Sequence, residues 1–444
     1  MKKISKKNSR FSFLVADRKG KVYDVPGVEP AGMKAGHYFR LRTRDFTEIH
    51  PDSELFLLPE RSPVGFDPDR KRFVEFSENP VSLRKGPCYA VAAFLSPGYT
   101  STFSPAYRSR ENFSALPLFS YSAVAFSAGR FFACGVKVDR EKRQELAGMD
   151  MGRLRKNVKE IRSIFPKNRL VKHLERCALT YCCPAGKNFF LKRYEAPLPT
   201  SPGCNAFCRG CISLQRGSGI PVTQPRINFV PSPEEVAEVA LFHMASAKDP
   251  VVSFGQGCEG EPLLEGKVLI ESVRLIRRGT SKGMINLNTN ASKPGIVAKL
   301  FDAGLDSMRV SVNSVRPELY SRYYRPRGYD LEDVISSIRA AKKASGFVSL
   351  NYLVMPGFTD SAAEAEAFRR FLQLTGADMV QWRNLNYDPE LYFREMRERP
   401  SIGDLVGIKE TIASVKKEFP RLMHGYFNPS KDRIQRHRRN ADFT

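Results

Sequence analysis

The sequence predicts an α/β fold in which a partial (β/α)6 barrel of the TIM type follows a mainly β N-terminal domain. Two observations lead to this fold class. Short apolar runs broken by proline and glycine fill residues 1–140, and strand-like and helix-like segments alternate after residue 185. The chain has 444 residues, of which 42% are hydrophobic, so it is long enough for two domains with buried cores.

Residues 1–140 are predicted to form the β domain because their apolar runs have the length of strands and no helical period. The runs cover residues 54–58, 88–95, 118–126 and 130–137. Cys88 and Cys134 fall inside these runs, so we expect both thiols to be packed in the core.

Residues 141–185 are predicted to be a helical linker with a cysteine-rich end. Apolar side chains recur every three or four residues in this stretch, which is the period of an amphipathic helix. Cys177, Cys182 and Cys183 follow, and His173 stands close to them in the sequence. Ligands of an auxiliary metal site and buried thiols at a domain junction are the two interpretations of this group.

Residues 186–395 are predicted to form the barrel. Five helix-length segments are each followed by a short apolar strand, and these strands cover residues 250–254, 285–289, 306–312, 348–355 and 379–385. Such an alternation builds parallel strands with right-handed crossovers. One more strand before the cysteine at 204 brings the number to six. Residues 396–444 are predicted to form a C-terminal helix and a basic tail.

Lysine and arginine outnumber aspartate and glutamate by 71 to 47, which gives a net charge of +24. This excess favours a polyanionic partner such as RNA, and a generally basic source proteome is the alternative explanation. No run of about 18 apolar residues occurs, so no membrane span is expected. The apolar run 11–16 is too short for a secretory signal. Nine irregularly spaced cysteines then indicate metal ligands or free thiols in a reducing cytoplasm.

The most specific motif is a C-x3-C-x2-C loop formed by Cys204, Cys208 and Cys211. Three thiolates on one short loop can hold three irons of a cubane cluster and leave the fourth iron without a protein ligand. An iron with an open position can bind and reduce a ligand. The alternative is a zinc site completed by a histidine or another cysteine.

Further candidate residues follow the other predicted strands, where catalytic groups of such a barrel gather. They are Cys258, Glu259, Gly260, Glu261, Ser311, Asn313 and Met355. A carboxylate such as Glu261 can bind an ammonium group, and a glycine such as Gly260 lets the backbone approach a ligand. Glu259 is expected either to bind substrate or to face solvent. Cys258 is predicted to be catalytic as a hydrogen donor, with an extra metal ligand and a packed thiol as the alternatives.

The cysteine loop follows a predicted strand, and a Gly/Glu-rich loop, residues 255–262, comes about fifty residues later. This combination resembles the radical S-adenosylmethionine (radical SAM) superfamily over residues 190–390. The resemblance implies a [4Fe–4S] cluster on the three cysteines and S-adenosylmethionine on the open iron. It also implies that Gly260 and Glu261 receive the methionine amino group. Ser311 and Asn313 would contact the ribose or carboxylate, and backbone near Met355 would pack against the adenine.

The chemistry that this resemblance implies is one-electron cleavage of S-adenosylmethionine to methionine and a 5′-deoxyadenosyl radical. An electron donor of the flavodoxin or ferredoxin type is implied as well. Because such donors are usually acidic, docking of the donor is a second explanation for the net charge of +24.

Three hypotheses for the function follow from the sequence. The first is a radical SAM enzyme that acts on RNA, and the second is one that activates or modifies a protein or peptide. The third is a non-catalytic iron–sulfur or zinc protein that binds nucleic acid. Tyrosines 320, 323 and 324, which alternate with arginines 322, 325 and 327, are interpreted either as a base-stacking surface or as an ordinary helix end.

Overall fold

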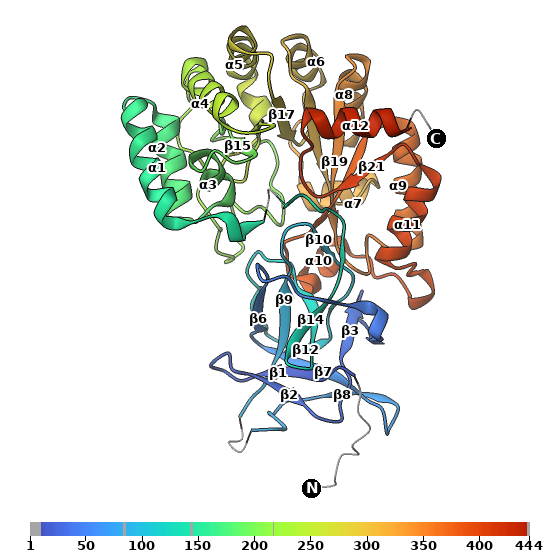
Figure 1. Cartoon of the computed structure of the whole chain (residues 1–444). Coiled ribbons are helices and arrows are strands. Elements are labelled where there is room, and N and C mark those ends of the chain that lie inside the picture. The colour runs from blue at the N-terminus through green and yellow to red at the C-terminus, as the bar shows by residue number, and fades with distance from the viewer. Residues whose placement is uncertain (1–9, 83–85, 143–144, 216, 442–444) are drawn as a thin grey trace. The chain divides into compact units, whose positions relative to one another are not determined.

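The structure is a computed structural model of the chain and describes residues 10–82, 86–142, 145–215 and 217–441. Residues 1–9 of the predicted β domain and 442–444 of the predicted tail lie outside this description. The chain divides into two compact units (Figure 1). Unit 1 contains Met1–Val138, Leu353–Glu366 and Arg383–Val415, and unit 2 contains Asp139–Tyr352, Ala367–Trp382 and Lys416–Thr444.

The N-terminal part of unit 1 consists of antiparallel strands, which confirms the predicted β domain. One sheet has the order β10-β14-β13-β9-β1-β2, with β5 paired to β14 and β6 to β9; the other two are β11-β3-β4 and β12-β7-β8. The strands are β1 (Phe13–Ala16), β2 (Val22–Val25), β3 (Ala31–Lys34), β4 (His37–Arg40), β5 (Phe46–Glu48), β6 (Glu54–Leu58), β7 (Arg61–Asp67), β8 (Arg72–Glu75), β9 (Tyr89–Phe94), β10 (Tyr99–Ser101), β11 (Ser104–Pro105), β12 (Tyr107–Ser109), β13 (Ser122–Ser127) and β14 (Arg130–Lys137).

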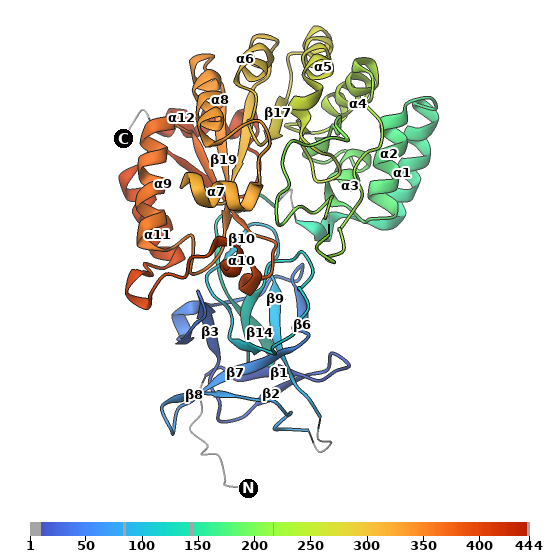
Figure 2. The same ribbon diagram turned by 180° about the vertical axis from the view of Figure 1, so that it is seen from behind.

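Unit 2 begins with three helices and continues into a parallel sheet, with α1 and α2 at the β15 end of that sheet (Figures 1 and 2). The strands are β15 (Glu195–Pro197), β16 (Val251–Phe254), β17 (Met284–Thr289), β18 (Ser307–Val312), β19 (Phe347–Val354), β20 (Met379–Asn384) and β21 (Met423–Gly425), and they neighbour one another in sequence order. The α-helices of both units are α1 (Met151–Ile164), α2 (Arg169–Leu179), α3 (Pro184–Phe190), α4 (Pro233–Ser246), α5 (Gly266–Gly279), α6 (Pro294–Asp302), α7 (Pro317–Tyr324), α8 (Leu331–Lys343), α9 (Ala362–Thr375), α10 (Pro389–Met396), α11 (Ile408–Glu418) and α12 (Lys431–Ala441). Of these, α10 belongs to unit 1, and α9 and α11 are divided between the two units.

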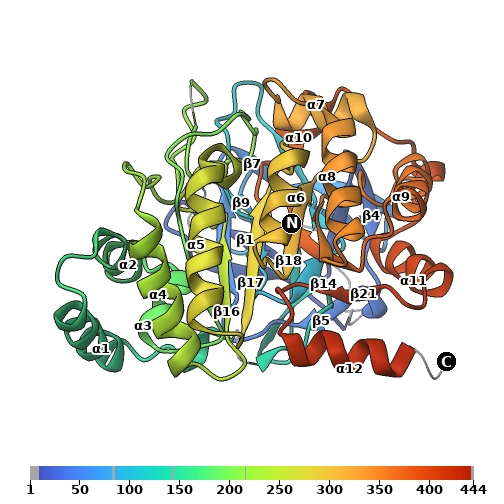
Figure 3. The same ribbon diagram turned by 90° about the horizontal axis from the view of Figure 1, so that it is seen from above.

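The predicted parallel sheet is confirmed, and it has one strand more than the six expected. The additional strand, β21, pairs with β20 through Met379 and Met423. It has three residues and lies in the segment 396–444, which was predicted to hold only a helix and a tail. A strand this short leaves no periodicity in the sequence, so its pairing depends on the neighbouring strand. Helices α4, α5, α6 and α8 lie along the outer face of the curved sheet (Figure 3).

The inward face of the parallel sheet changes from apolar to polar along the strands. Val251, Met284 and Met379 belong to one buried apolar cluster. Two residues further along each strand the same face carries Ser253, Asn286 and Gln381, because residues two apart in a strand share a face. The amide of Asn286 donates to the Ser253 hydroxyl at 3.2 Å. The interior is therefore closed at one end and lined by hydrogen-bonding groups toward the carboxyl ends of the strands.

A buried ion pair stabilises unit 1. The guanidinium of Arg61 donates to Oδ2 of Asp388 at 2.7 Å, and both side chains are fully buried. The same Oδ2 accepts the backbone N–H of Leu116 at 3.1 Å, while Oδ1 accepts backbone N–H groups at the start of α10. Removing one member of the pair leaves the other charge buried without its partner.

Replacing Asp388 by alanine is therefore expected to lower the free energy of unfolding of unit 1 by about 3–5 kcal/mol. The control is Glu48→Ala, which removes the exposed partner of Arg130 and is expected to cost less than about 1 kcal/mol. Urea unfolding followed by the fluorescence of tyrosine and tryptophan measures both. Equal losses in the two variants would contradict the assignment.

Candidate active site

The cysteine loop lies between β15 and α4 and is fixed by backbone hydrogen bonds on two sides. On one side the N–H groups of Gly260 and Glu261 donate to the carbonyls of Ser201 and Gly203, at 2.6 and 2.8 Å. On the other side the N–H of Phe207 donates to the carbonyl of Tyr324 at 2.9 Å, just at the end of α7. These bonds fix the main chain on both sides of Cys204.

The three thiols of this loop have different surroundings. Burial raises the pKa of Cys204 to about 11, and the nearby Glu261 adds to the rise; burial also raises the pKa of Cys208. Burial acts the same way on Cys211, but hydrogen bonds from Ser213 and the Arg226 guanidinium outweigh it and lower the pKa of Cys211. Nη2 of Arg226 lies 3.3 Å from the sulfur of Cys211. The loop thus contains one thiol prepared for the charged form and two that would ionise only with a compensating cation.

Glu259 is buried and joins the ends of the first two barrel strands. One of its oxygens accepts the backbone N–H groups of Thr200 and Ser201 at 2.7 and 3.1 Å, after β15. The other accepts those of Gly255 and Gln256 at 2.5 and 3.1 Å, after β16. Burial raises the pKa of Glu259 to about 7, while the four backbone donors oppose the rise. Glu259 is 4% exposed, so the expectation that it faces solvent is wrong.

Glu261 is also buried, and its carboxylate connects the Gly/Glu-rich loop to the end of β17. Its Oε2 accepts the backbone N–H of Asn290 at 2.8 Å, and its Oε1 accepts the hydroxyl of Thr289 and the N–H of Leu263. Burial raises the pKa of Glu261 to about 7, and these donors oppose the rise. A carboxylate has about four acceptor positions, so one position on Oε2 remains available for a further donor.

Gly260 allows the Gly/Glu-rich loop to approach the cysteine loop. A Cβ at this position would lie 1.7 Å from the carbonyl oxygen of Gly203, next to Cys204. Gly255 has the same property toward the next strand, because its Cβ would lie 1.7 Å from the carbonyl oxygen of Asn288, and its φ is +75°. Both glycines are therefore required by close contact between backbones.

The remaining predicted residues follow β18 and β19. Ser311 is half-buried on β18 and accepts the amide of Asn351 at 3.0 Å. Asn313 follows β18 directly and is fully buried. Because the strands are parallel, these two residues lie at the same sheet edge as Glu261. Met355 follows β19, is 2% exposed and belongs to unit 1. The roles of all these residues toward a ligand stay predictions.

The tyrosines after β18 do not form a surface for stacking bases. Tyr320, Tyr323 and Tyr324 are all buried, and the rings of Tyr320 and Tyr324 stack on each other at 4.6 Å. They belong to α7, whose end holds the cysteine loop. Arg327 stacks on Phe207 of that loop at 4.0 Å. The tyrosine–arginine segment thus supports the cysteines, which corrects the interpretation as a nucleic-acid surface.

Cys258 lies beside the linker cysteines. Its thiol is 2% exposed and lies within 4.8 Å of the ligand atoms of Cys177 and His173. The hydrogen bond from Cys258 and the adjacent His173 lower the pKa of Cys177 to about 5. Cys183 is half-buried nearby, whereas Cys182 is exposed. Of the three linker cysteines predicted as an auxiliary group, Cys177 therefore lies next to Cys258, whereas Cys182 points away from it into solvent. The catalytic role of Cys258 stays a prediction.

Sequence reasoning missed the contacts of two residues that hold the cysteine loop, Arg226 outside it and Asn205 within it. Arg226 stands in an irregular segment, and nothing in its surroundings marks it as a partner of Cys211. Asn205, which stands between the first two cysteines, accepts from Asn290 at 2.8 Å and donates to Ser292 at 3.0 Å. The position of Asn205 directly after the first cysteine was the only feature of the sequence that could have pointed to its contacts with Asn290 and Ser292.

The donor set of the loop fits an iron–sulfur cluster. All nine cysteines are free, and the loop presents three of them from one segment with a cationic neighbour. Among the described residues, His173, Cys177 and Cys258 are close enough together to bind one ion. The three loop cysteines do not form such a close group. Sulfur atoms bound to one zinc ion lie about 3.8 Å apart. The loop therefore suits several metal atoms better than a single zinc ion.

Residues 198–369 match the family model described as the radical SAM superfamily. This segment is a radical SAM domain. The match lies inside the range 190–390 to which the sequence resemblance was assigned and contains the three loop cysteines. Proteins of this superfamily are enzymes with a [4Fe–4S] cluster and S-adenosylmethionine, so these predictions are confirmed at the level of the superfamily. Among the described residues, no helix is both long and apolar enough to cross a membrane.

Curated proteins that are similar to this chain have several activities. The probable dual-specificity RNA methyltransferase RlmN of Fervidobacterium nodosum is 24% identical over 234 residues, which cover 50% of this chain and 63% of that protein. The FeMo cofactor biosynthesis protein NifB of Klebsiella pneumoniae is 24% identical, covering 40% and 41%. The probable GTP 3′,8-cyclase of Thermococcus kodakarensis is 37% identical, covering 23% and 32%. The chain thus spans less than two thirds of each of these relatives.

Solved structures with similarity to the chain include a radical SAM methyltransferase from Sphaerobacter thermophilus. It is 16% identical with a TM-score of 0.34, covering 46% of this chain and 63% of that one. The FeFe-hydrogenase maturase HydG from Carboxydothermus hydrogenoformans is 14% identical with a TM-score of 0.36, covering 61% and 68%.

Replacing Gly260 by alanine is expected to lower the iron and sulfide that the chain retains after anaerobic reconstitution. The added methyl group forces the backbone at Gly203 away and moves Cys204 with it. Gly295→Ala is the matched control, since its Cβ meets no atom within 4 Å. Iron and sulfide analysis with the visible absorption spectrum measures the effect. An unchanged cluster content in Gly260→Ala would show that this contact does not position the loop.

Proposed function

We propose that the chain reductively cleaves S-adenosylmethionine at a [4Fe–4S] cluster held by Cys204, Cys208 and Cys211. The observation that carries the proposal is the fixation of this loop between the Gly260–Glu261 segment and α7. When bound, such a cluster supplies one electron to the sulfonium and yields methionine and a 5′-deoxyadenosyl radical, which takes a hydrogen atom from the substrate.

The residues of the chain bind and orient the cosubstrate in this proposal. The free acceptor position on Oε2 of Glu261 takes the methionine ammonium group through a charge-assisted hydrogen bond. Gly260 keeps the backbone at that point close to the loop. Ser311 and Asn313 hold the ribose or carboxylate, and backbone near Met355 packs against the adenine.

An electron donor of the flavodoxin or ferredoxin type completes the reaction. The net charge of +24 favours docking of an acidic protein by long-range attraction. We propose a reducing cytoplasm as the location of the chain, and the nine free cysteines and the oxygen sensitivity of a cluster with an open iron support this.

RNA is the substrate class that we propose. The net charge and the polar interior of the barrel both support a ligand rich in phosphates and hydrogen-bonding groups. A relative that matches half of this chain is named as an RNA methyltransferase. A protein or peptide substrate is the alternative, and it would use the β domain of unit 1 for recognition.

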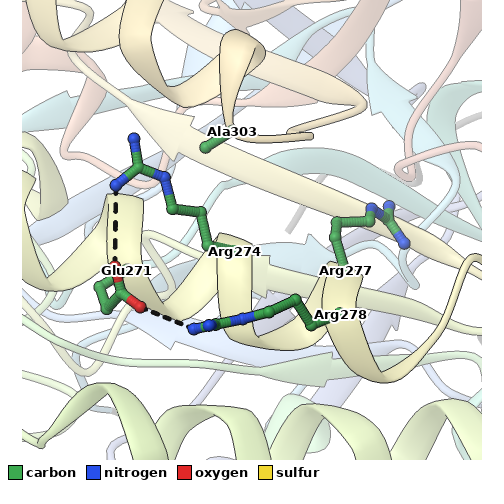
Figure 4. A pocket seen from close by; sticks show the side chains of 5 residues that line it. All are labelled: Glu271, Arg274, Arg277, Arg278 and Ala303. Atoms are coloured by element: carbon green, nitrogen blue, oxygen red, sulfur yellow. Dashed lines mark hydrogen bonds and ion pairs between the residues drawn. The ribbon is translucent and has the colours of Figure 1, made fainter.

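A cleft on α5 supplies cationic groups for such an RNA (Figure 4). It measures about 570 Å³ and is lined by Glu271, Arg274, Arg277, Arg278 and Ala303. Arg274 and Arg278 are 60% and 67% exposed and share the single carboxylate of Glu271. The cleft lies at the C-terminal end of α5, away from the sheet edge that carries the cysteines. A 14-residue helix is about 21 Å long, a distance that a short RNA hairpin spans.

Reduction of the anaerobically reconstituted protein with dithionite is expected to convert S-adenosylmethionine into 5′-deoxyadenosine. Cys208→Ala is expected to form none, because the cluster loses one of its three ligands. Cys182→Ser is the matched control and is expected to keep the activity, since Cys182 is exposed. Liquid chromatography of the products measures the 5′-deoxyadenosine formed by each variant. A wild type that carries zinc but no iron and forms no 5′-deoxyadenosine would contradict the proposal.

The wild type is expected to bind single-stranded RNA with an affinity that falls as salt rises. Replacing Arg274 and Arg278 by alanine should reduce the slope of log K against log salt by about 1.4, or about 0.7 for each phosphate contact. The double lysine variant keeps both charges and should keep the slope. Binding is followed by fluorescence anisotropy of labelled RNA. Salt-independent binding in the wild type would favour the protein or peptide substrate instead.

A further inference from the structure

A second group of metal-ligating side chains lies outside the cysteine loop. It consists of His173 and Cys177 on α2 and Cys258 in the Gly/Glu-rich loop, and their ligand atoms all lie within 4.8 Å of one another. The two cysteines are 1% and 2% exposed, while His173 is half-buried.

The distances in this group suit one tetrahedral ion. His173 and Cys177 stand four residues apart on α2, which places both on one face of the helix. Nε2 of His173 lies 3.5 Å from the sulfur of Cys177. An ion with bonds of about 2.3 Å to sulfur and about 2.0–2.1 Å to nitrogen separates two such ligands by about 3.6 Å at the tetrahedral angle. His173 and Cys177 therefore need little movement to bind one ion.

We propose that His173, Cys177 and Cys258 bind one zinc ion, with Cys183 as the fourth ligand. Thiolate and imidazole are the ligands that zinc prefers in closed structural sites. This site differs from the cysteine loop in its ligands and needs no S-adenosylmethionine, so it goes beyond the proposed reaction.

Cys183 is chosen as fourth ligand because the backbone brings it back toward α2. Cys182 has a left-handed φ of +53°, and after this turn the N–H of Cys183 donates to the carbonyl of Cys177 at 2.9 Å. The thiol of Cys183 lies outside the group of three ligand atoms that are within 4.8 Å of one another, so its side chain has to turn toward them when the ion binds. Cys182 is turned outward by the same bend and is exposed.

The ion would connect α2 to the loop that supports the cysteine triad. Cys258 directly precedes Glu259, whose carboxylate holds the ends of β15 and β16. The backbone carbonyl of Cys258 also accepts the N–H of Ile227 at 2.8 Å. A zinc-bound thiolate carries no S–H hydrogen, so this assignment replaces the role of Cys258 as a hydrogen donor.

The test uses the full chain with Cys204, Cys208 and Cys211 replaced by alanine, which removes the cluster loop as a source of bound metal. This variant is expected to retain one zinc ion per chain after anaerobic dialysis. Adding Cys258→Ser or His173→Ala to it should abolish that zinc, whereas adding Cys182→Ser should not. Metal analysis measures the zinc, and circular dichroism checks that each variant is folded. Loss of zinc in the Cys182→Ser background would overturn the ligand set.

Cobalt(II) provides a second measurement that does not depend on stability. Bound at His173, Cys177 and Cys258, it is expected to give the absorption of tetrahedral cobalt with thiolate ligands, and this absorption should weaken in Cys183→Ser. Three other results would overturn the proposal. They are a triple variant that binds neither metal, one that retains iron with sulfide, and one in which mass spectrometry finds Cys177 and Cys258 joined by a disulfide.

Discussion

The carboxylate of Glu259 is the interaction on which the candidate site depends. It receives four backbone N–H groups, two from the segment after β15 and two from the segment after β16. Neither segment has a regular partner for these groups, and a buried N–H without a partner is costly. One acidic side chain therefore fixes both the approach to Cys204 and the start of the Gly/Glu-rich loop. Glu261 repeats the arrangement one strand further, toward Asn290.

The sequence was sufficient to predict the barrel strands and the cysteine loop because both are encoded locally. Apolar runs such as 250–254 and 306–312 are short, bounded and separated by amphipathic helices, and β16 and β18 form within a residue of those limits. The triad needs only spacing to be recognised. The strand ends also share one edge in any parallel sheet, so Glu261 and Asn313 could be assigned to the same side before their contacts were known.

The contacts that sequence reasoning missed depend on segments that are distant along the chain. Arg226 reaches Cys211 from an irregular stretch. The tyrosine side chains of α7 are buried, and backbone carbonyls at the end of α7 accept N–H groups of the cysteine loop, whereas the pattern with arginines had suggested an exposed surface. Strand β21 is too short to show a period and forms on the edge offered by β20. Glu259 and Glu261 have identical side chains two residues apart, and only the fold shows that their carboxylates bind different strands.

The segment 255–261 contacts the cysteine loop on one side and α2 on the other, and these two contacts explain its composition. Toward the cysteine loop it must come within backbone contact, so Gly260 has no side chain and Glu261 bonds inward. Toward α2 it presents Cys258 to His173 and Cys177. A loop with three glycines has little stiffness of its own, since glycine restricts the backbone least. Carboxylates on one side and an ion on the other would supply that stiffness, and the cysteine triad would then rest on a support fixed from both directions.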